Sequence, residues 1–211
     1  MNRPVIYVLA GVNGAGKSSI GGHLLTRAGL GWFNPDQFAR EWRAASGCSV
    51  TEANATAWQE GMRRLAAACE RGQSYAFETT LGGRSVPARL IDAARTHDVL
   101  VWYCGLASPE LHLARIRARV AAGGHDIPEA KVRERWAASV SNLIALLPHL
   151  SQARLFDNSA TVAPGEAVPE PIHVATFDHG RLAWPAPNDS TQLARTPDWA
   201  KPVLEAALRA G

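Results

Sequence analysis

The 211-residue sequence has few of the residues that mark secreted, metal-binding or membrane proteins. Its three cysteines, Cys48, Cys69 and Cys104, lie far apart and none has C-x-x-C spacing. A disulfide framework and a cysteine metal site are therefore not expected. No apolar run approaches the length of a membrane span, and the first one, residues 5–10, leads into a glycine-rich turn without the layout of a signal peptide. These features predict a reduced, cytoplasmic protein.

The sequence also lacks a strong excess of charge of one sign. It has 22 Lys and Arg against 19 Asp and Glu, a formal net charge of +3, and its arginines are dispersed. This distribution predicts neither a nucleic-acid partner nor a membrane surface as partner. Hydrophobic residues make up 46% of the chain, enough for a substantial core. We expect one domain, residues 1–211.

One of only three lysines stands in a glycine-rich turn, "GVNGAGKSS". Gly11, Gly16, Lys17 and Ser18 fit G-x-x-x-x-G-K-[ST], the P-loop pattern. Glycines let successive backbone N–H groups surround a phosphate, and the following helix adds its positive end. The lysine can reach the β- and γ-phosphates, and the serine hydroxyl can ligate Mg²⁺. The residues predicted to bind nucleotide in this loop are Gly11, Asn13, Gly14, Ala15, Gly16, Lys17, Ser18 and Ser19.

Short apolar runs alternate with helical patterns along the first 160 residues. Strands are predicted at 5–10, 75–78, 99–106 and 153–156, with a weaker fifth at 32–33. Helices are predicted at 17–28, 36–45, 51–71, 86–96, 109–122 and 128–147. The alternation predicts an α/β fold with a five-stranded parallel sheet. The P-loop, "NPD" and "ETT" then meet at the carboxyl ends of the strands, where such sheets bind ligands.

Two acidic residues at these strand ends are candidates for chemistry. Asp36 opens a helix, where an acid can simply stabilise the helix end. It can also accept or orient the proton of a hydroxyl during phosphoryl transfer. Glu78 ends an apolar strand, so it could hold Mg²⁺ through water or accept hydrogen bonds from substrate hydroxyls. Arg84, in the turn beyond, could pair with an anionic substrate or remain solvated.

A flexible Gly123-Gly124 pair stands between two arginine-bearing helices. Arg119 precedes it, and Arg133 and Arg135 follow it. This pattern is typical of a lid that closes over phosphates, here about residues 119–136, although solvated helix charge is the simpler interpretation. His125 could be a further lid donor. Trp58 and Trp136 are expected in the core.

The last 50 residues have a different character. A loop rich in proline and small residues leads to a predicted hairpin at 172–184 with its turn at Asp178-His179-Gly180, and then to a terminal helix within 196–211. Residues 161–211 are therefore predicted to form a small hairpin-plus-helix appendage on a core of residues 1–160.

Taken in order, "GVNGAGKSS", "NPD", "FETTLGG", "RVAAGGHDIPE", Asn142-Leu143 and "LFDNS" resemble the zeta toxin family of P-loop kinases. The resemblance covers residues 4 to about 160. It implies an ATP-dependent kinase, with GTP as an alternative donor, that phosphorylates the sugar of UDP-N-acetylglucosamine with Mg²⁺. It also implies that any antitoxin would be a separate polypeptide.

The resemblance assigns roles residue by residue. Asp36 takes the place of the catalytic aspartate, Glu78 and Thr80 the substrate-sugar contacts, and Arg119 that of a phosphate-contacting lid arginine. Lys17 and Ser18 take the nucleotide and Mg²⁺ roles. Arg133, Arg135 or His125 could supply the second lid cation.

The chain departs from the toxins proper at two places. Thr79 stands where they carry the glycine of E-G-T, and the lid sequence differs. The chain therefore resembles the chromosomal zeta-like branch, whose acceptor does not follow from the name. Two alternatives stay open: a kinase of another hydroxyl metabolite, and a non-enzymatic binding module gated by nucleotide. Asp36 favours an enzyme, because a pure switch needs no base opposite the γ-phosphate.

Overall fold

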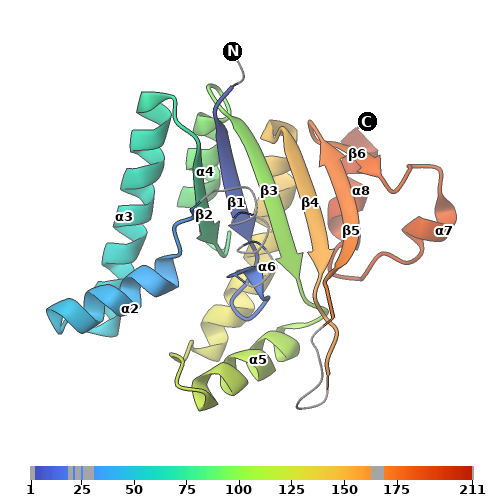
Figure 1. Ribbon diagram of the computed structural model, residues 1–211. Coiled ribbons are helices and arrows are strands. Elements are labelled where there is room, and N and C mark those ends of the chain that lie inside the picture. The colour runs from blue at the N-terminus through green and yellow to red at the C-terminus, as the bar shows by residue number, and fades with distance from the viewer. Residues whose placement is uncertain (1–2, 19–20, 22–24, 26–30, 163–168, 211) are drawn as a thin grey trace.

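A six-stranded mixed sheet forms the centre of the protein (Figure 1). The computed structural model describes residues 3–18, 21, 25, 31–162 and 169–210. The strand order is β2-β1-β3-β4-β5-β6. The first four strands of this order are parallel, and β5 and β6 continue the sheet in antiparallel fashion. The strands are β1 (Val5–Ala10), β2 (Tyr75–Thr79), β3 (Asp98–Gly105), β4 (Gln152–Asp157), β5 (Ile172–Asp178) and β6 (Arg181–Trp184).

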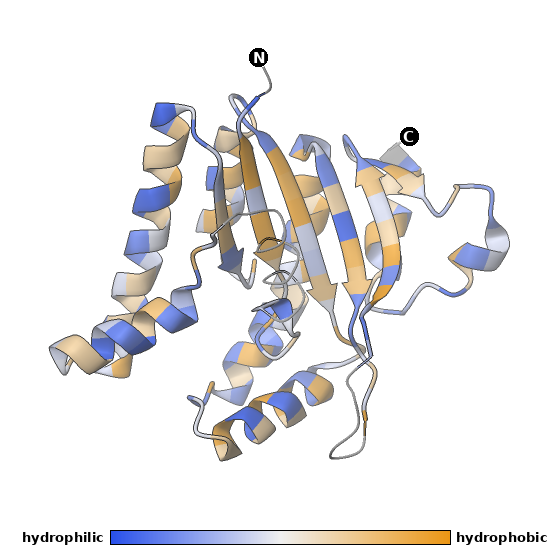
Figure 2. Ribbon diagram, viewed as in Figure 1, coloured by the Kyte–Doolittle hydropathy of each residue, from blue (hydrophilic) through white to orange (hydrophobic). Residues whose placement is uncertain are grey.

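The central strands are apolar on both faces, as Figure 2 shows for β1 and β3, because helices cover both faces of a parallel sheet. On one face, Ile6 of β1 and Val101 of β3 belong to the main core. On the other face, Leu9 packs with Leu25 of the helix that follows the P-loop. The alternation of side chains along each strand therefore builds two cores at once.

The helices of the first face are α4, α6 and α8, which lie behind the sheet in Figure 1, and α6 contacts both of the others. Several helices begin at a side-chain cap. Asn34 caps α2 and Ser108 caps α5, while Ser49 and Glu52 form a capping box for α3. The bounds are α2 Pro35–Ser46, α3 Val50–Arg71, α4 Ser85–Ala93, α5 Pro109–Ala121, α6 Glu129–Leu146, η1 Leu147–His149, α7 Ser190–Leu193 and α8 Lys201–Ala210.

The predicted α/β fold is confirmed, with a difference in strand count. The four longer predicted strands form the parallel part of the sheet, but the weak fifth is a single bridge between Phe33 and Phe77. Of the helix predicted at 17–28, residues 17, 18, 21 and 25 are helical and the others lie outside the described residues. The short α7 was not predicted, and α8 begins at Lys201. No helix among the described residues is both long and apolar enough to cross a membrane.

The C-terminal hairpin and helix are integral to the sheet and its core. β5 pairs with β4 over almost its whole length, and α8 packs against α6. Trp199, just before α8, is buried over Gly105, and its indole N–H donates to Asp157 at 2.9 Å. The C-terminal segment thereby contacts the ends of β3 and β4 beside the P-loop.

Gly105 leaves no room for a side chain, because a Cβ there would lie 2.5 Å from the Trp199 ring. We expect Gly105→Ala to lower the free energy of unfolding by about 1–3 kcal/mol through overpacking. Gly83→Ala is the matched control, since nothing lies within 4 Å of its Cβ position. Urea denaturation of the two variants makes the comparison, and equal stability would show that Trp199 can move aside freely.

Candidate active site beside the P-loop

The P-loop connects β1 to the helix that includes Lys17 and Ser18. Gly11, Gly14 and Gly16 have φ angles of 135°, 83° and 87°, which residues with a side chain rarely adopt. Space is also lacking. A Cβ at Gly11 would collide with the carbonyl oxygen of Cys104, and one at Gly16 would lie 2.5 Å from Asn158 Nδ2. The glycines are therefore required both by the turn and by its close packing on β3 and on the residue after β4.

Polar groups from neighbouring elements hold this loop through the Ala15 carbonyl. The carbonyl oxygen of Ala15 accepts hydrogen bonds from Cys104 Sγ and from Asn158 Nδ2, both at 2.9 Å. Arg115 of α5 in turn donates to the carbonyl oxygen of Asn158 at 2.6 Å. Burial raises the pKa of the Cys104 thiol to about 12, so the thiol keeps its proton and remains a donor.

His112 supports the loop from α5. Its Nδ1 lies 2.8 Å from the carbonyl oxygen of Asn13, and because that oxygen can only accept, Nδ1 carries the proton. Burial lowers the pKa of His112 to about 4. The imidazole is therefore neutral near pH 7 and acts as a structural donor rather than a proton carrier.

The Glu78 carboxylate joins three elements at the other side of the loop. It accepts hydrogen bonds from Ser18 Oγ at 3.1 Å, Trp32 Nε1 at 2.9 Å and Asn34 Nδ2 at 3.2 Å, and it is buried. Asn34 also caps α2 through its Oδ1, so the same residue that contacts Glu78 fixes the start of the helix that carries Asp36. Neither Trp32 nor Asn34 was predicted as a site residue, although "NPD" pointed to the segment.

Ser18 and Glu78 also form a donor set suited to Mg²⁺, which prefers hard oxygen ligands and keeps several of its waters. The hydroxyl and the carboxylate already lie within hydrogen-bond distance of each other. The residues present therefore fit the metal that the P-loop implies: Ser18 would be a direct ligand, and Glu78 would hold a metal-bound water.

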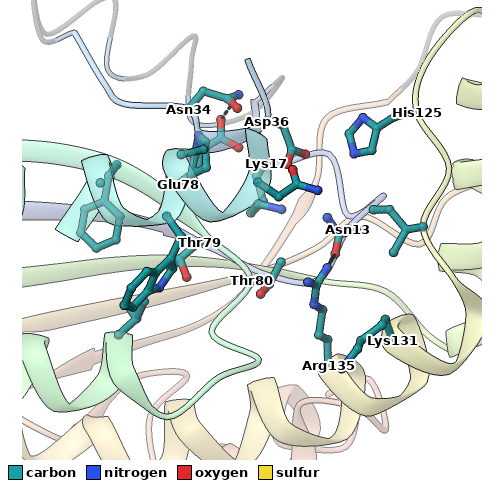
Figure 3. Close-up of a pocket in the computed structure, with 18 of the residues that line it drawn as sticks. Asn13, Lys17, Asn34, Asp36, Glu78, Thr79, Thr80, His125, Lys131 and Arg135 are labelled. Carbon is teal, nitrogen blue, oxygen red and sulfur yellow. Dashed lines mark hydrogen bonds between the residues drawn. The ribbon is translucent and has the colours of Figure 1, made fainter. Parts of the chain in front are cut away.

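A cavity of about 460 Å³ opens beside the P-loop (Figure 3). Asp36, at the exposed first turn of α2, lines it together with Lys17. The predicted nucleotide and substrate residues among its lining are Asn13, Lys17, Asp36, Glu78, Thr80 and Arg135. The α3 helix and the segment 125–128 supply further parts of the lining. The structure thus brings the P-loop lysine and the two candidate acids to one cavity.

The lid arginines divide into two groups. Arg135 reaches the P-loop, where its guanidinium donates to Asn13 Oδ1 at 2.8 Å (Figure 3). Its stem lies over Gly82, whose Cβ position is 2.6 Å from Arg135 Cγ. Arg133 points elsewhere and pairs with Glu129 and Glu110 at 2.7 and 2.8 Å on an exposed face.

Three further predicted site residues are not seen in the cavity lining; they are Arg119, Arg84 and Ser19. Arg119 lies under the connection between α5 and α6, donates to the carbonyl oxygen of His125 at 3.2 Å and has a buried Nε. Arg84 is exposed at the start of α4, outside the cavity lining. Ser19 lies outside the described residues.

The glycine pair in this connection has a packing role. Gly123 adopts a φ of 88°, and the Gly124 N–H donates to the carbonyl oxygen of Arg119 at 2.9 Å. A Cβ at Gly124 would lie 2.7 Å from Arg119 Cγ. The turn therefore folds onto the Arg119 stem and carries His125 to the cavity wall.

Trp58 does not lie where the sequence predicted. It was expected in the core, but in the structure it is 50% exposed and lines the cavity. Trp136, by contrast, packs against the core as expected. The hydrophobic pattern of α3 does not separate a tryptophan that faces a core from one that faces a cavity.

Residues 6–143 match a family model described as AAA domain (AAA_33). This chain belongs to the AAA domain family. Its α/β architecture is that of a P-loop kinase. No curated protein matches the sequence of this AAA domain.

Solved structures support the same fold. The AvrRxo1-ORF1:-ORF2 complex with ATP contains a chain that is 20% identical, with a TM-score of 0.65 over 86% of this chain and 60% of that chain. The AAA domain therefore spans less than two thirds of that protein. The PezAT chromosomal toxin-antitoxin system of Streptococcus pneumoniae contains another, 16% identical, with a TM-score of 0.57 over 74% of this chain and 68% of that chain.

We expect Asn158→Ala to weaken nucleotide binding, because the Ala15 carbonyl would lose one of its two side-chain donors. Loss of that buried hydrogen bond should raise the Kd for MgATP by roughly 10-fold. Asn188→Ala, in an exposed turn far along the chain, should leave the Kd unchanged. Isothermal titration calorimetry measures both constants. Wild-type affinity in a folded Asn158→Ala protein would mean that the loop keeps its shape without this contact.

Proposed function

We propose that the protein transfers the γ-phosphoryl group of ATP to a hydroxyl group of a small molecule. The observation that carries the proposal is the shared cavity, which is lined by the P-loop lysine Lys17 and by the carboxylate-bearing Asp36. A phosphate-binding loop alone would serve a switch as well as an enzyme. A carboxylate on the wall of the same cavity supplies what transfer to a hydroxyl additionally requires.

In this mechanism the P-loop N–H groups and Lys17 hold the phosphates, and Arg135 lies close enough to the P-loop to reach them from α6. The acceptor oxygen attacks the γ-phosphorus, the bond to the bridging oxygen breaks, and ADP leaves with that electron pair. The acceptor proton passes to the Asp36 carboxylate. Mg²⁺, when bound by Ser18 with Glu78 behind a water, would offset phosphate charge.

Glu78 and Thr80 support an acceptor that carries several hydroxyl groups. Both line the cavity, and the carbonyl oxygen of Thr80 is held by Ser139 of α6 at 2.7 Å. Together with the resemblance to zeta toxins, they favour the sugar of UDP-N-acetylglucosamine as acceptor and the chromosomal zeta-like branch as the closer kin. The PezAT likeness also favours a separate antitoxin polypeptide as partner.

The role of Asp36 is tested with Asp36→Asn, which keeps the size of the side chain and removes its basicity. We expect phosphoryl transfer to fall about 100-fold or more, the size of a general-base contribution, while the Kd for MgATP stays unchanged in calorimetry. Asp92→Asn, at an exposed carboxylate of α4, is the matched control and should retain full transfer. Loss of ATP affinity in Asp36→Asn would reassign the residue to the nucleotide.

The acceptor is tested by incubating the protein with MgATP and UDP-N-acetylglucosamine. The proposal predicts a product heavier by one phosphoryl group in mass spectrometry and ATP consumption well above the water background. A different hydroxyl metabolite labelled in a screen with radioactive ATP, with no product from the UDP-sugar, would replace this acceptor. Absence of transfer to every acceptor would contradict the phosphotransferase proposal itself.

A further inference from the structure

One face of α3 forms a wall of the cavity. The residues on it recur at helical spacing over more than three turns; they are Val50, Thr51, Asn54, Ala57, Trp58, Gly61 and Met62. Ala57 and Gly61 are buried, whereas Thr51, Asn54 and Trp58 are exposed. The cavity therefore meets a polar and aromatic surface at this wall.

Trp58 is not explained by packing. It belongs to none of the hydrophobic clusters formed by the described residues, and half of its surface is exposed. Leaving an indole half-exposed inside a cavity forgoes hydrophobic stabilisation. A planar ring that stacks on the indole would recover that stabilisation and add the specific attraction between aromatic faces.

Asn54 and Thr51 stand one and two turns before Trp58 on the same face. Neither side chain makes a hydrogen bond with another residue that the structure describes, although both line the cavity. A carboxamide offers two N–H donors and a carbonyl acceptor. It can therefore pair with the polar edge of a ring whose face lies on Trp58.

A second helix brings cationic groups to the cavity. Lys131 and Arg135 of α6 belong to the same lining as the α3 residues, and His125 is a further member of it. Lys131 also pairs with the exposed Glu134 at 2.9 Å. A ring-bearing acceptor with a phosphate group would meet a stacking surface on α3 and positive charge on α6.

We propose that Trp58 and Asn54 form the subsite for a planar ring of the acceptor, so that the enzyme selects a ring-bearing hydroxyl compound such as a nucleotide derivative. This inference rests on the proposed function, because it concerns the acceptor side of the same cavity. It assigns specificity to α3, whereas the P-loop and Asp36 carry the transfer.

The experiment measures ring binding separately from phosphoryl transfer. Protein saturated with Mg²⁺ and the non-hydrolysable ATP analogue AMP-PNP is titrated with UMP, CMP, AMP and GMP, and with ribose 5-phosphate, which shares their sugar phosphate and lacks the base. We expect at least one of the four nucleotides to bind at least 10-fold more tightly than ribose 5-phosphate. Trp58→Ala should weaken that nucleotide by about 10- to 100-fold, the range measured for base stacking on aromatic side chains.

Three variants make the result specific. Trp58→Phe keeps an aromatic face and should stay within about 3-fold of wild type. Asn54→Ala should reduce the preference among the four bases. Trp42→Ala is the matched control, because Trp42 is 45% exposed on α2, stacks on Phe38 and is absent from the cavity lining. It should leave every affinity unchanged.

Three results would overturn the proposal. They are equal affinity for the nucleotides and for ribose 5-phosphate, nucleotide binding that Trp58→Ala does not weaken, and nucleotides that bind only by displacing AMP-PNP. None of these readouts involves transfer. Ring binding that depends on Trp58 can therefore be observed even if UDP-N-acetylglucosamine is not phosphorylated. Failure of the ring subsite is thus distinguishable from failure of the proposed phosphoryl transfer.

Discussion

The close contact between the P-loop and the backbone at the ends of β3 and β4 is the constraint on which the site depends. Gly11 fits against the Cys104 carbonyl only because it has no Cβ, and Gly16 fits against Asn158 for the same reason. The Ala15 carbonyl then accepts two hydrogen bonds from those neighbours. A loop held this tightly is organised for phosphate before any nucleotide binds.

The other parts of the site are positioned relative to that loop. Glu78 links it to β2 and, through Asn34, to the start of α2, which places Asp36 at the cavity. Arg135 links the loop to α6 through Asn13. The acid and the cation therefore line the same cavity from two separate elements, α2 and α6. The α3 wall of the cavity is a third element, distinct from the loop and from these two groups.

The sequence predicted the features that depend on local sequence pattern better than those that depend on tertiary packing. The P-loop motif and the strand ends correctly brought Lys17, Asp36 and Glu78 to one edge, because parallel strands share their carboxyl ends. Helical angles could not tell which of Arg133 and Arg135 meets Asn13, since that depends on how α6 lies on Gly82. The side of α3 that bears Trp58 was likewise set by tertiary packing. The sheet edge formed by β5 and β6 was expected as an appendage on the core, because the pattern of a hairpin does not indicate which strand it will pair with.

The central claim is that Lys17 and the loop around it stabilise a phosphoryl group in transfer, and Lys17→Ala tests it most directly. Steady-state turnover of MgATP, measured on variant protein whose circular dichroism and melting temperature match wild type, should fall roughly 100-fold or more, the effect of removing one preorganised charge contact from the transition state. Turnover at the wild-type rate in the folded variant would contradict the account.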